Sequence, residues 1–397
     1  MQTMSSATDF LPPAPAVAVP EDAENPGGFA HVPALDGVRG LAILLVLFDH
    51  LFWANNVTGN RLLDVMSDVR ESSYIGVNLF FALSGFLITG ILLDTLATPH
   101  FLRTFYARRS LRIFPLYYGV LILLLALTRP MHFEWNGWQY FYLTYTANLG
   151  LWHGGLGLGA ININHFWSLQ VEEQFYLIWP FVVYRVRSLT WLIRLSLMAC
   201  AGVLALRIGL VLARPHLVDP YVMYSPTYAC ADNLLFGCCL CAVLRTGLRE
   251  KVLRISPWVA GSCVAVLLGM ALGNDGLRWQ KSFSIPTFGF SLLGVLSAAL
   301  IAMTLRKGSP TQAVFRNPAL RFFGKYSYGL YVFHPTIARY LTVPVRAFVD
   351  AEFHSKALGV LAGALIAGVA SVLVALLSYH LYEVHFLKLK KHISYGT

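Results

Sequence analysis

Charged residues are scarce in this chain of 397 residues. Asp, Glu, Lys and Arg make up 13% of the sequence, whereas a soluble domain carries about 25%. Hydrophobic residues make up 56%, and the mean hydropathy is +0.59. A chain with so little charge cannot cover a large water-exposed surface. The composition therefore argues against an ordinary soluble protein and predicts an integral membrane protein.

A full set of cysteine and histidine ligands for a metal is also lacking. Cys238, Cys239 and Cys241 are not matched by a further pair of His or Cys at the spacing of a zinc site, and all six cysteines lie in apolar stretches. We therefore expect small buried hydrophobic side chains, with neither a disulfide framework nor a metal site. The cysteines are Cys200, Cys230, Cys238, Cys239, Cys241 and Cys263.

Residues 1–34 lack the pattern of a signal peptide, because no basic stretch precedes a long apolar run. Rich in Ala, Pro, Ser and acidic residues, they are expected to form a disordered cytoplasmic tail. The membrane domain is predicted to cover residues 35–391, followed by a short tail at 392–397. No internal repeat is visible, nor a pair of Gly/Pro-broken spans in matching halves, the usual signs of a secondary transporter.

Ten apolar segments of near-membrane length follow the tail, so the predicted fold is all-α, a polytopic bundle of about ten transmembrane helices. They cover residues 36–54, 72–93, 113–128, 165–184, 189–213, 221–244, 255–274, 282–305, 326–345 and 357–382. The aromatic stretch 138–151 is short, and we expect an interfacial or re-entrant segment there.

Lysine and arginine are unevenly distributed between the two sets of connections that these spans create. One set, which includes the C-terminal tail, holds 19 basic residues and the other holds 8. Because basic residues favour the cytoplasmic side, both termini are predicted to be cytoplasmic. The formal charge of +10 is then mostly a topology signal, and no nucleic-acid partner is expected. The richer set consists of residues 95–112, 185–194, 245–254, 306–325 and the tail.

The first apolar segment carries Arg39 near its start and His50 near its end. Eleven residues at 100° each bring both side chains to nearly the same helix face, about 16 Å apart along the axis. Ionisable groups in an apolar helix are costly, and each is a hypothesis for a functional site. The structural alternative is an interfacial anchor for Arg39 and a hydrogen-bonded core histidine for His50.

A second polar group lies in the sequence HFWSLQVEEQFYLIWP, at 165–180. His165 and Glu172 are seven residues apart and share a helix face, while Glu173 lies about 100° further round. A carboxylate opposite an imidazole can fix its tautomer and strengthen it as a base. Alternatively, one of these carboxylates pairs with Arg207 or Arg339 to neutralise a buried charge.

Three arginines, Arg108, Arg109 and Arg112, cluster in the sequence YARRSLRIFPLY at 106–117. They fit a site for a phosphorylated cofactor, since the arginine fork matches phosphate oxygens. The alternative is that these arginines only mark the cytoplasmic side of the membrane, as basic residues commonly do. Asp232 and His334 also lie at membrane depth, and His334 could be a ligand, a proton relay or a satisfied core residue.

Taken together, these motifs resemble the acyltransferase-3 family of membrane enzymes, which O-acylate extracytoplasmic sugars, lipids and some natural products. The resemblance runs from about Pro33 to about Lys391. Besides the stretches quoted above, it rests on LDGVRG, LFFALSGFLI, SYGLYVFHP and SYHLYE. One departure is His385, which stands where a proline is expected two residues after Glu383. The family implies ten spans with cytoplasmic termini.

The resemblance implies a division of roles among the polar residues. Catalysis is expected from His50, Arg39, Glu172 and Glu173. The expected co-substrate is acyl-CoA, with acetyl-CoA as the first candidate, and no metal is expected. The residues expected to bind it are Arg39, Arg108, Arg109 and Arg112. Roles in substrate contact or in the polar framework are expected for His165, Trp167, Ser168, Asp232, Tyr328 and His334.

The predicted function is transfer of an acetyl or other short acyl group from cytoplasmic acyl-CoA to a hydroxyl of an extracytoplasmic carbohydrate, lipid or metabolite. The predicted location is the inner (cytoplasmic) membrane, as a multi-pass protein in contact with lipid. A proton-coupled transporter of a small solute is the alternative, because it would also bury His, Asp, Glu and Arg. A transporter would move its solute without consuming acyl-CoA.

Overall fold

The fold is given by a computed structural model of the chain. It describes residues 32–52, 61–128, 137, 140–149, 157–158, 161–213, 223–273 and 283–395. Most of the predicted N-terminal tail, up to residue 31, and the last two residues of the C-terminal tail lie outside the described residues.

The described residues are almost entirely helical. In chain order the α-helices are α1 Pro33–Leu51, α2 Arg61–Glu71, α3 Ile75–Thr95, α4 Phe101–Leu127, α5 Tyr140–Leu143, α6 Trp167–Val186, α7 Leu189–Ala213, α9 Thr227–Val243, α10 Arg249–Gly273, α11 Phe290–Leu305, α12 Pro310–Phe315, α13 Pro318–Lys325, α14 Ser327–Phe353, α15 Lys356–Ser378 and α16 Val384–Leu389. Short 3₁₀ or π turns are η1 Ala147–Leu149, η3 Asn164–Phe166, η4 Ile285–Gly289, η5 Tyr379–Glu383 and η6 Lys390–His392. In the described part, the only strands are β1 Gly157–Leu158 and β2 Ile161–Asn162, an antiparallel pair of two residues each.

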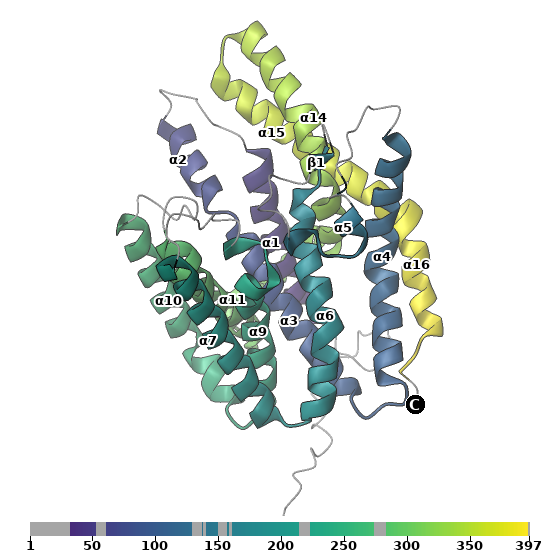
Figure 1. Cartoon of the computed structure of the whole chain (residues 1–397). Helices are drawn as coiled ribbons and strands as arrows, with labels where there is room; N and C mark the ends of the chain where they lie inside the picture. The colour runs from purple at the N-terminus through teal and green to yellow at the C-terminus, as the bar shows by residue number, and fades with distance from the viewer. Residues whose placement is uncertain are drawn as a thin grey trace, which may run out of the picture.

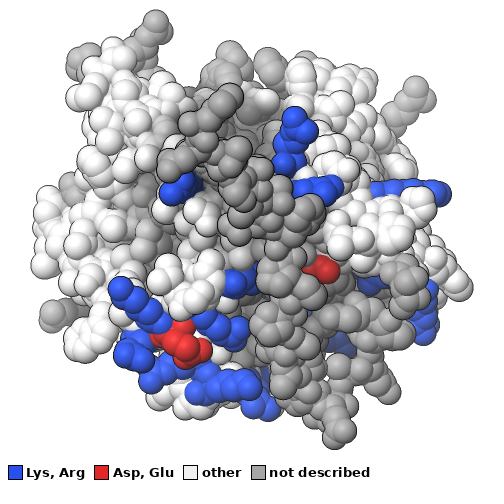
Figure 2. Space-filling model, turned by 90° about the horizontal axis from the view of Figure 1, so that it is seen from below, with Lys and Arg blue, Asp and Glu red and all other residues white. Residues whose placement is uncertain are grey.

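The helices form one bundle with α1 and α3 in its interior (Figure 1). Helices α7, α9, α10 and α11 gather on one side of it, while α4 and α16 lie on the other. Helices α14 and α15 form an antiparallel pair that projects beyond the rest at the upper end. The C-terminus lies at the lower end, and Figure 2, which views that end, shows many Lys and Arg side chains on its surface.

Each of the ten apolar segments predicted from the sequence overlaps a helix. Within the described residues, six helical stretches are long and apolar enough to cross a membrane, judged by length and composition. They are Val65–Thr95, Phe101–Leu127, Leu189–Ala213, Arg249–Gly273, Ile285–Leu305 and Lys356–His392. The all-helical membrane architecture is therefore supported, with six candidate spans.

Glycines allow two close helix contacts that fix the interior. A Cβ atom added at Gly40 of α1 would lie 1.9 Å from the carbonyl oxygen of Leu320 in α13, and one at Gly324 of α13 would lie 1.8 Å from that of Asp36. In the same way, a Cβ at Gly85 of α3 would lie 2.0 Å from a carbonyl oxygen of α9. Gly40 of LDGVRG therefore lets the start of α1 pack closely against α13, and this packing positions the neighbouring Arg39.

One local expectation needs adjustment. The third apolar segment predicted from the sequence begins at residue 113, after YARRSLR, but α4 is one continuous helix from Phe101 to Leu127 and Pro115 lies inside it. The proline carbonyl oxygen accepts a hydrogen bond from the Tyr382 hydroxyl at 3.1 Å. In the aromatic stretch 138–151, the described residues 140–149 form only the short turns α5 and η1, consistent with the expected non-spanning segment.

Candidate active site

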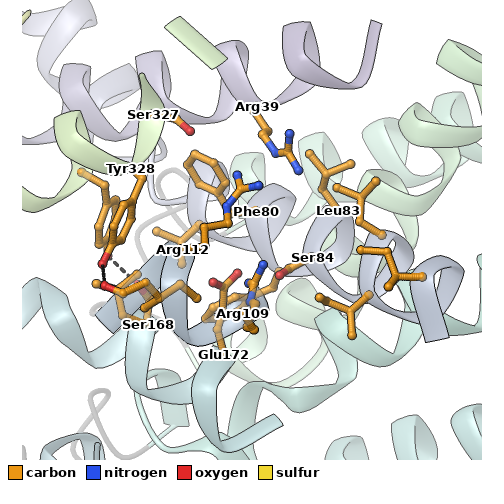
Figure 3. Close-up of a pocket in the computed structure, with 18 residues that line it drawn as sticks. Arg39, Phe80, Leu83, Ser84, Arg109, Arg112, Ser168, Glu172, Ser327 and Tyr328 are labelled. Carbon is orange, nitrogen blue, oxygen red and sulfur yellow. Dashed lines mark hydrogen bonds between the residues drawn. The ribbon is translucent and has the colours of Figure 1, made fainter. Parts of the chain in front are cut away.

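Arginine side chains from two helices meet in a cavity of about 190 Å³ between α1, α3, α4, α6 and α14. Arg39 of α1, together with Arg109 and Arg112 of α4, lines this cavity, and Glu172 of α6 lies with them. Figure 3 shows the three guanidinium groups directed into the same space, with the Glu172 carboxylate beside Arg109. The opposite walls are mostly aliphatic and aromatic side chains of α3, such as Leu83.

Arg39 is positioned by its own helix. Its guanidinium donates to the carboxylate of Asp36, one turn earlier, at 2.8 Å. The side chain of Arg39 remains 23% exposed and lines the cavity. On the same helix face, Ile43 and Val46 are fully buried. The stripe between Arg39 and His50 therefore faces the protein interior.

The three arginines of α4 do not act as one group. Arg109 lies over the ring of Tyr176, 3.9 Å from the centroid, which is a cation–π contact. Arg112 lines the cavity alongside it. Arg108 does not line the cavity and instead donates to the backbone carbonyl oxygens of Lys390 at 3.0 Å and Ile393 at 2.6 Å. The structure thus separates Arg108 from the other two predicted cofactor-binding arginines.

The adjacent carboxylates of α6 both interact electrostatically with Arg109. Glu172 lies near the hydroxyls of Ser84 and Tyr176, which contact each other. One carboxylate oxygen of Glu173 is buried without a hydrogen-bond partner among the described residues. Neither carboxylate forms a hydrogen bond or ion pair with His50 in the described part of the chain. Their contacts tie them to the arginine cavity rather than to the imidazole.

Three histidines from three helical segments lie together beyond the cavity. The ring centroids of His50 and His334 are 4.9 Å apart, and those of His165 and His334 are 5.7 Å apart. His334 is fully buried and His165 nearly so. We call these three residues the histidine cluster.

Hydrogen bonds to backbone carbonyls assign one nitrogen of each ring as a donor. His50 Nδ1 lies 2.9 Å from the Val46 oxygen, and His334 Nδ1 lies 2.9 Å from the Leu330 oxygen. His165 Nε2 lies 3.3 Å from a backbone oxygen of α14. A carbonyl oxygen can only accept, so each of these nitrogens carries the proton. In the neutral rings, the second nitrogen, such as Nε2 of His50, is then a free base.

Tyr331 joins the arginine cavity to the histidine cluster. Its hydroxyl donates to the His165 carbonyl oxygen at 2.7 Å, and it lies 2.6 Å from the Ser168 hydroxyl. Because the single Tyr331 proton goes to the carbonyl, Ser168 donates to Tyr331. Ser168 and Tyr331 therefore line the cavity and also lie against His165 of the histidine cluster.

Other predicted residues have surroundings of their own. Asp232 is fully buried in a two-pronged ion pair with Arg207, with nitrogen–oxygen distances of 2.6 and 3.2 Å. This pair links α7 to α9 and does not line the cavity. Trp167 packs against Phe81 and Tyr224. Tyr328 does line the cavity, and its hydroxyl donates to a backbone carbonyl of α4 at 2.7 Å.

Sequence reasoning missed three residues of this arrangement: Tyr331, Ser84 and Asp36. Tyr331 precedes His334 by three residues on one helix, so its position on the same face could have been inferred. Asp36 precedes Arg39 by the same spacing. Ser84 offers no such signal, because its place depends on how α3 packs against α6.

Comparison with known proteins agrees with the resemblance read from the motifs. A family model described as an acyltransferase domain matches residues 32–380, and the chain belongs to this acyltransferase-3 family. No solved structure matches the chain.

Two curated relatives illustrate the similarity. The chain is 29% identical over 348 residues to the peptidoglycan O-acetyltransferase OatA of Listeria monocytogenes, covering 79% of this chain and 50% of that protein. It is 28% identical over 386 residues to the protein YrhL of Bacillus subtilis, provisionally named a peptidoglycan O-acetyltransferase, covering 89% and 54%. The chain spans about half the length of the curated relatives it matches.

Proposed function

We propose that this protein is a multi-pass O-acyltransferase of the cytoplasmic membrane that moves an acetyl group from cytoplasmic acetyl-CoA to a hydroxyl of an extracytoplasmic glycan. The observation that supports it most is a series of polar side chains inside an apolar bundle, which we call the path. Three arginines, Ser168 and Tyr331 line the cavity, and the Tyr331 hydroxyl contacts His165 of the histidine cluster. A purely structural bundle has no use for so many ionisable groups. The names of the two relatives make peptidoglycan-like sugars the first acceptors to test.

The donor binds from the end that carries the basic connections. Arg39, Arg109 and Arg112 bind the phosphates of CoA, since guanidinium groups match phosphate oxygens and keep their charge. This assignment requires the ten-span topology with both termini in the cytoplasm. The basic surface in Figure 2 supports that orientation, because it lies at the same end as the C-terminus.

The reaction takes place at the histidine cluster. His50 Nε2 removes the proton of the acceptor hydroxyl, the oxygen attacks the thioester carbonyl carbon, and the carbon–sulfur bond breaks. The imidazolium then returns the proton to the CoA thiolate. The Nδ1 hydrogen bond to Val46 supports this role, because it leaves Nε2 as the basic nitrogen. Direct transfer needs no covalent intermediate on His50.

Glu172 and Glu173 act at the donor end in this proposal. Their charges lie beside Arg109, so they set the position of that guanidinium in the cavity. A structural framework role fits Asp232, whose carboxylate is fully engaged by Arg207. The hydrogen bond between Tyr331 and Ser168 positions the histidine cluster relative to the arginine cavity.

The proposal is tested by comparative mass spectrometry of surface glycans and secreted metabolites from cells with and without the protein. We expect one glycan to gain the mass of one acetyl group only in cells that contain the protein. In parallel, the purified protein in lipid nanodiscs receives isotope-labelled acetyl-CoA and the modified glycan's precursor. Solute transport without release of CoA thiol would overturn the proposal and favour a transporter.

A further inference from the structure

The C-terminal segment, residues 384–395, runs back along α4, which begins at the donor end of the molecule (Figure 1). Arg108 of α4 anchors it by donating to the carbonyl oxygens of Lys390 and Ile393. The ring of Tyr395 lies 5.7 Å from the Arg108 guanidinium carbon. An arginine that could have faced the cavity therefore holds the end of the chain in place.

This anchoring places another cation near the cavity arginines. Lys390 is half-buried and lies close enough to Arg112, Arg109 and Arg108 for their charges to interact. Among the described residues, no ion pair joins Lys390, Arg108 or Arg112 to a carboxylate. The carboxylates nearby are Glu172 and Glu173 beside Arg109, and Glu383 near Arg112. Like charges brought close together disfavour one another, so a half-buried ammonium with no ion-pair partner among the described residues fits a site that receives an anion.

We propose that the Lys390 ammonium binds a phosphate of the acyl donor, so that residues 384–395 complete the donor-binding site. This inference rests on the proposed function, which supplies the phosphorylated donor. Lys390 contributes a compact charge with three donors, and Arg112 contributes a planar fork. Arg108 does not touch the donor in this arrangement. It is a positioning residue that acts through the backbone of the segment.

The experiment compares Lys390→Gln with Lys391→Gln, a matched control that removes the neighbouring exposed charge. Each protein in nanodiscs is given three donors: acetyl-CoA, acetyl-3′-dephospho-CoA and S-acetylpantetheine, which has no nucleotide and no diphosphate. Losing one charge-assisted contact raises KM for acetyl-CoA about tenfold to a hundredfold. With S-acetylpantetheine, Lys390→Gln and wild type have the same KM. The dephospho donor shows whether Lys390 binds the 3′-phosphate or the diphosphate.

A second pair of variants tests the anchoring separately. Lys390→Arg keeps the charge and is expected to retain a KM within a few fold of wild type. Arg108→Gln raises KM for acetyl-CoA in the same donor-dependent way, and adding Lys390→Gln to it has little further effect, because both changes remove one contact.

The outcomes separate this inference from the proposed function. If wild type transfers acetyl from acetyl-CoA but Lys390→Gln and Lys391→Gln have equal KM values, the role of Lys390 is wrong and the proposed function stands. An equal loss with all three donors also overturns it, because the effect is then not phosphate binding. If wild type uses none of the donors, the proposed function fails and this inference fails with it.

Discussion

Replacing His50 by alanine is the most direct perturbation of the proposed reaction. The hydrogen bond from Nδ1 to the Val46 oxygen leaves Nε2 as the base, and the substitution removes that nitrogen. A general base contributes about 10²–10⁴ to the rate, or about 3–5 kcal/mol of transition-state stabilisation. His334 lies only 4.9 Å away between ring centroids and can partly replace it. We therefore expect His50→Ala to lower kcat about 10²-fold.

The double variant His50→Ala/His334→Ala removes the substitute base, so its loss is expected to approach 10⁴-fold, about the upper limit for general-base catalysis. The assay is release of CoA thiol from acetyl-CoA with acceptor glycan in nanodiscs. KM for acetyl-CoA is expected to stay unchanged, because the arginine cavity is untouched. His385→Ala, which changes an exposed histidine, is the control. A kcat for His50→Ala within threefold of wild type would refute the reasoning.

Four further predictions concern the donor site, the framework and the link between them. Arg39→Ala is expected to raise KM for acetyl-CoA about tenfold or more with little change in KM for the acceptor, measured by steady-state kinetics. Arg207→Met leaves the Asp232 carboxylate buried and unpaired, so we expect a loss of about 3–5 kcal/mol in unfolding free energy, whereas Arg207→Met/Asp232→Leu recovers most of it. Gly40→Val forces α1 away from α13 and is expected to destabilise the protein by about 1–3 kcal/mol, seen as a lower Tm. Tyr331→Phe removes a hydroxyl that joins two helices, and a kcat decrease of about three- to tenfold is expected without a change in donor KM.

Each of these predictions has a contradicting outcome. Equal effects of Arg39→Ala on donor and acceptor would argue against phosphate binding by this residue. A double variant at Arg207 and Asp232 that is no more stable than the single one would show that the pair does more than neutralise charge. An unchanged Tm for Gly40→Val would mean that the α1–α13 contact can relax. An unchanged kcat for Tyr331→Phe would show that its hydroxyl does not help to position the histidine cluster.

The sequence located the helices well because apolar length is a local property. All ten predicted segments overlap helices, and the resemblance to the acyltransferase-3 family is confirmed. Four helices that overlap predicted segments, α1, α6, α9 and α14, are absent from the six candidate spans. Helix α9 is short, whereas α1, α6 and α14 carry Arg39, Glu172 and Tyr331, respectively. Polar residues therefore reduce the apolar signal of three of the helices that line the cavity.

The direction of individual side chains could not be obtained from spacing alone. Arg108 and Arg112 share a helix face one turn apart, yet Arg108 is bound by carbonyls 282 and 285 residues further along the chain. Similarly, the sequence allowed Glu172 to face either an imidazole or an arginine. The packing of α4 against α6 places it beside Arg109. Both outcomes depend on partners that are remote in sequence. No local pattern encodes such partners.

The separation of the two ends of the path has a consequence for specificity. The arginines that we propose bind phosphate lie around Arg39, and the proposed base lies in the histidine cluster. A buried aliphatic stripe including Ile43 and Val46 lies between Arg39 and His50 on α1. A donor that spans this stripe must be charged at one end and uncharged along its arm, because a second charge in the middle would be desolvated without a partner. The Tyr331–Ser168 hydrogen bond marks where the cavity meets the histidines. If the proposed function holds, the distance and the aliphatic stripe between the arginines and the histidine cluster select the donor by its length and polarity, before any contact with the acceptor.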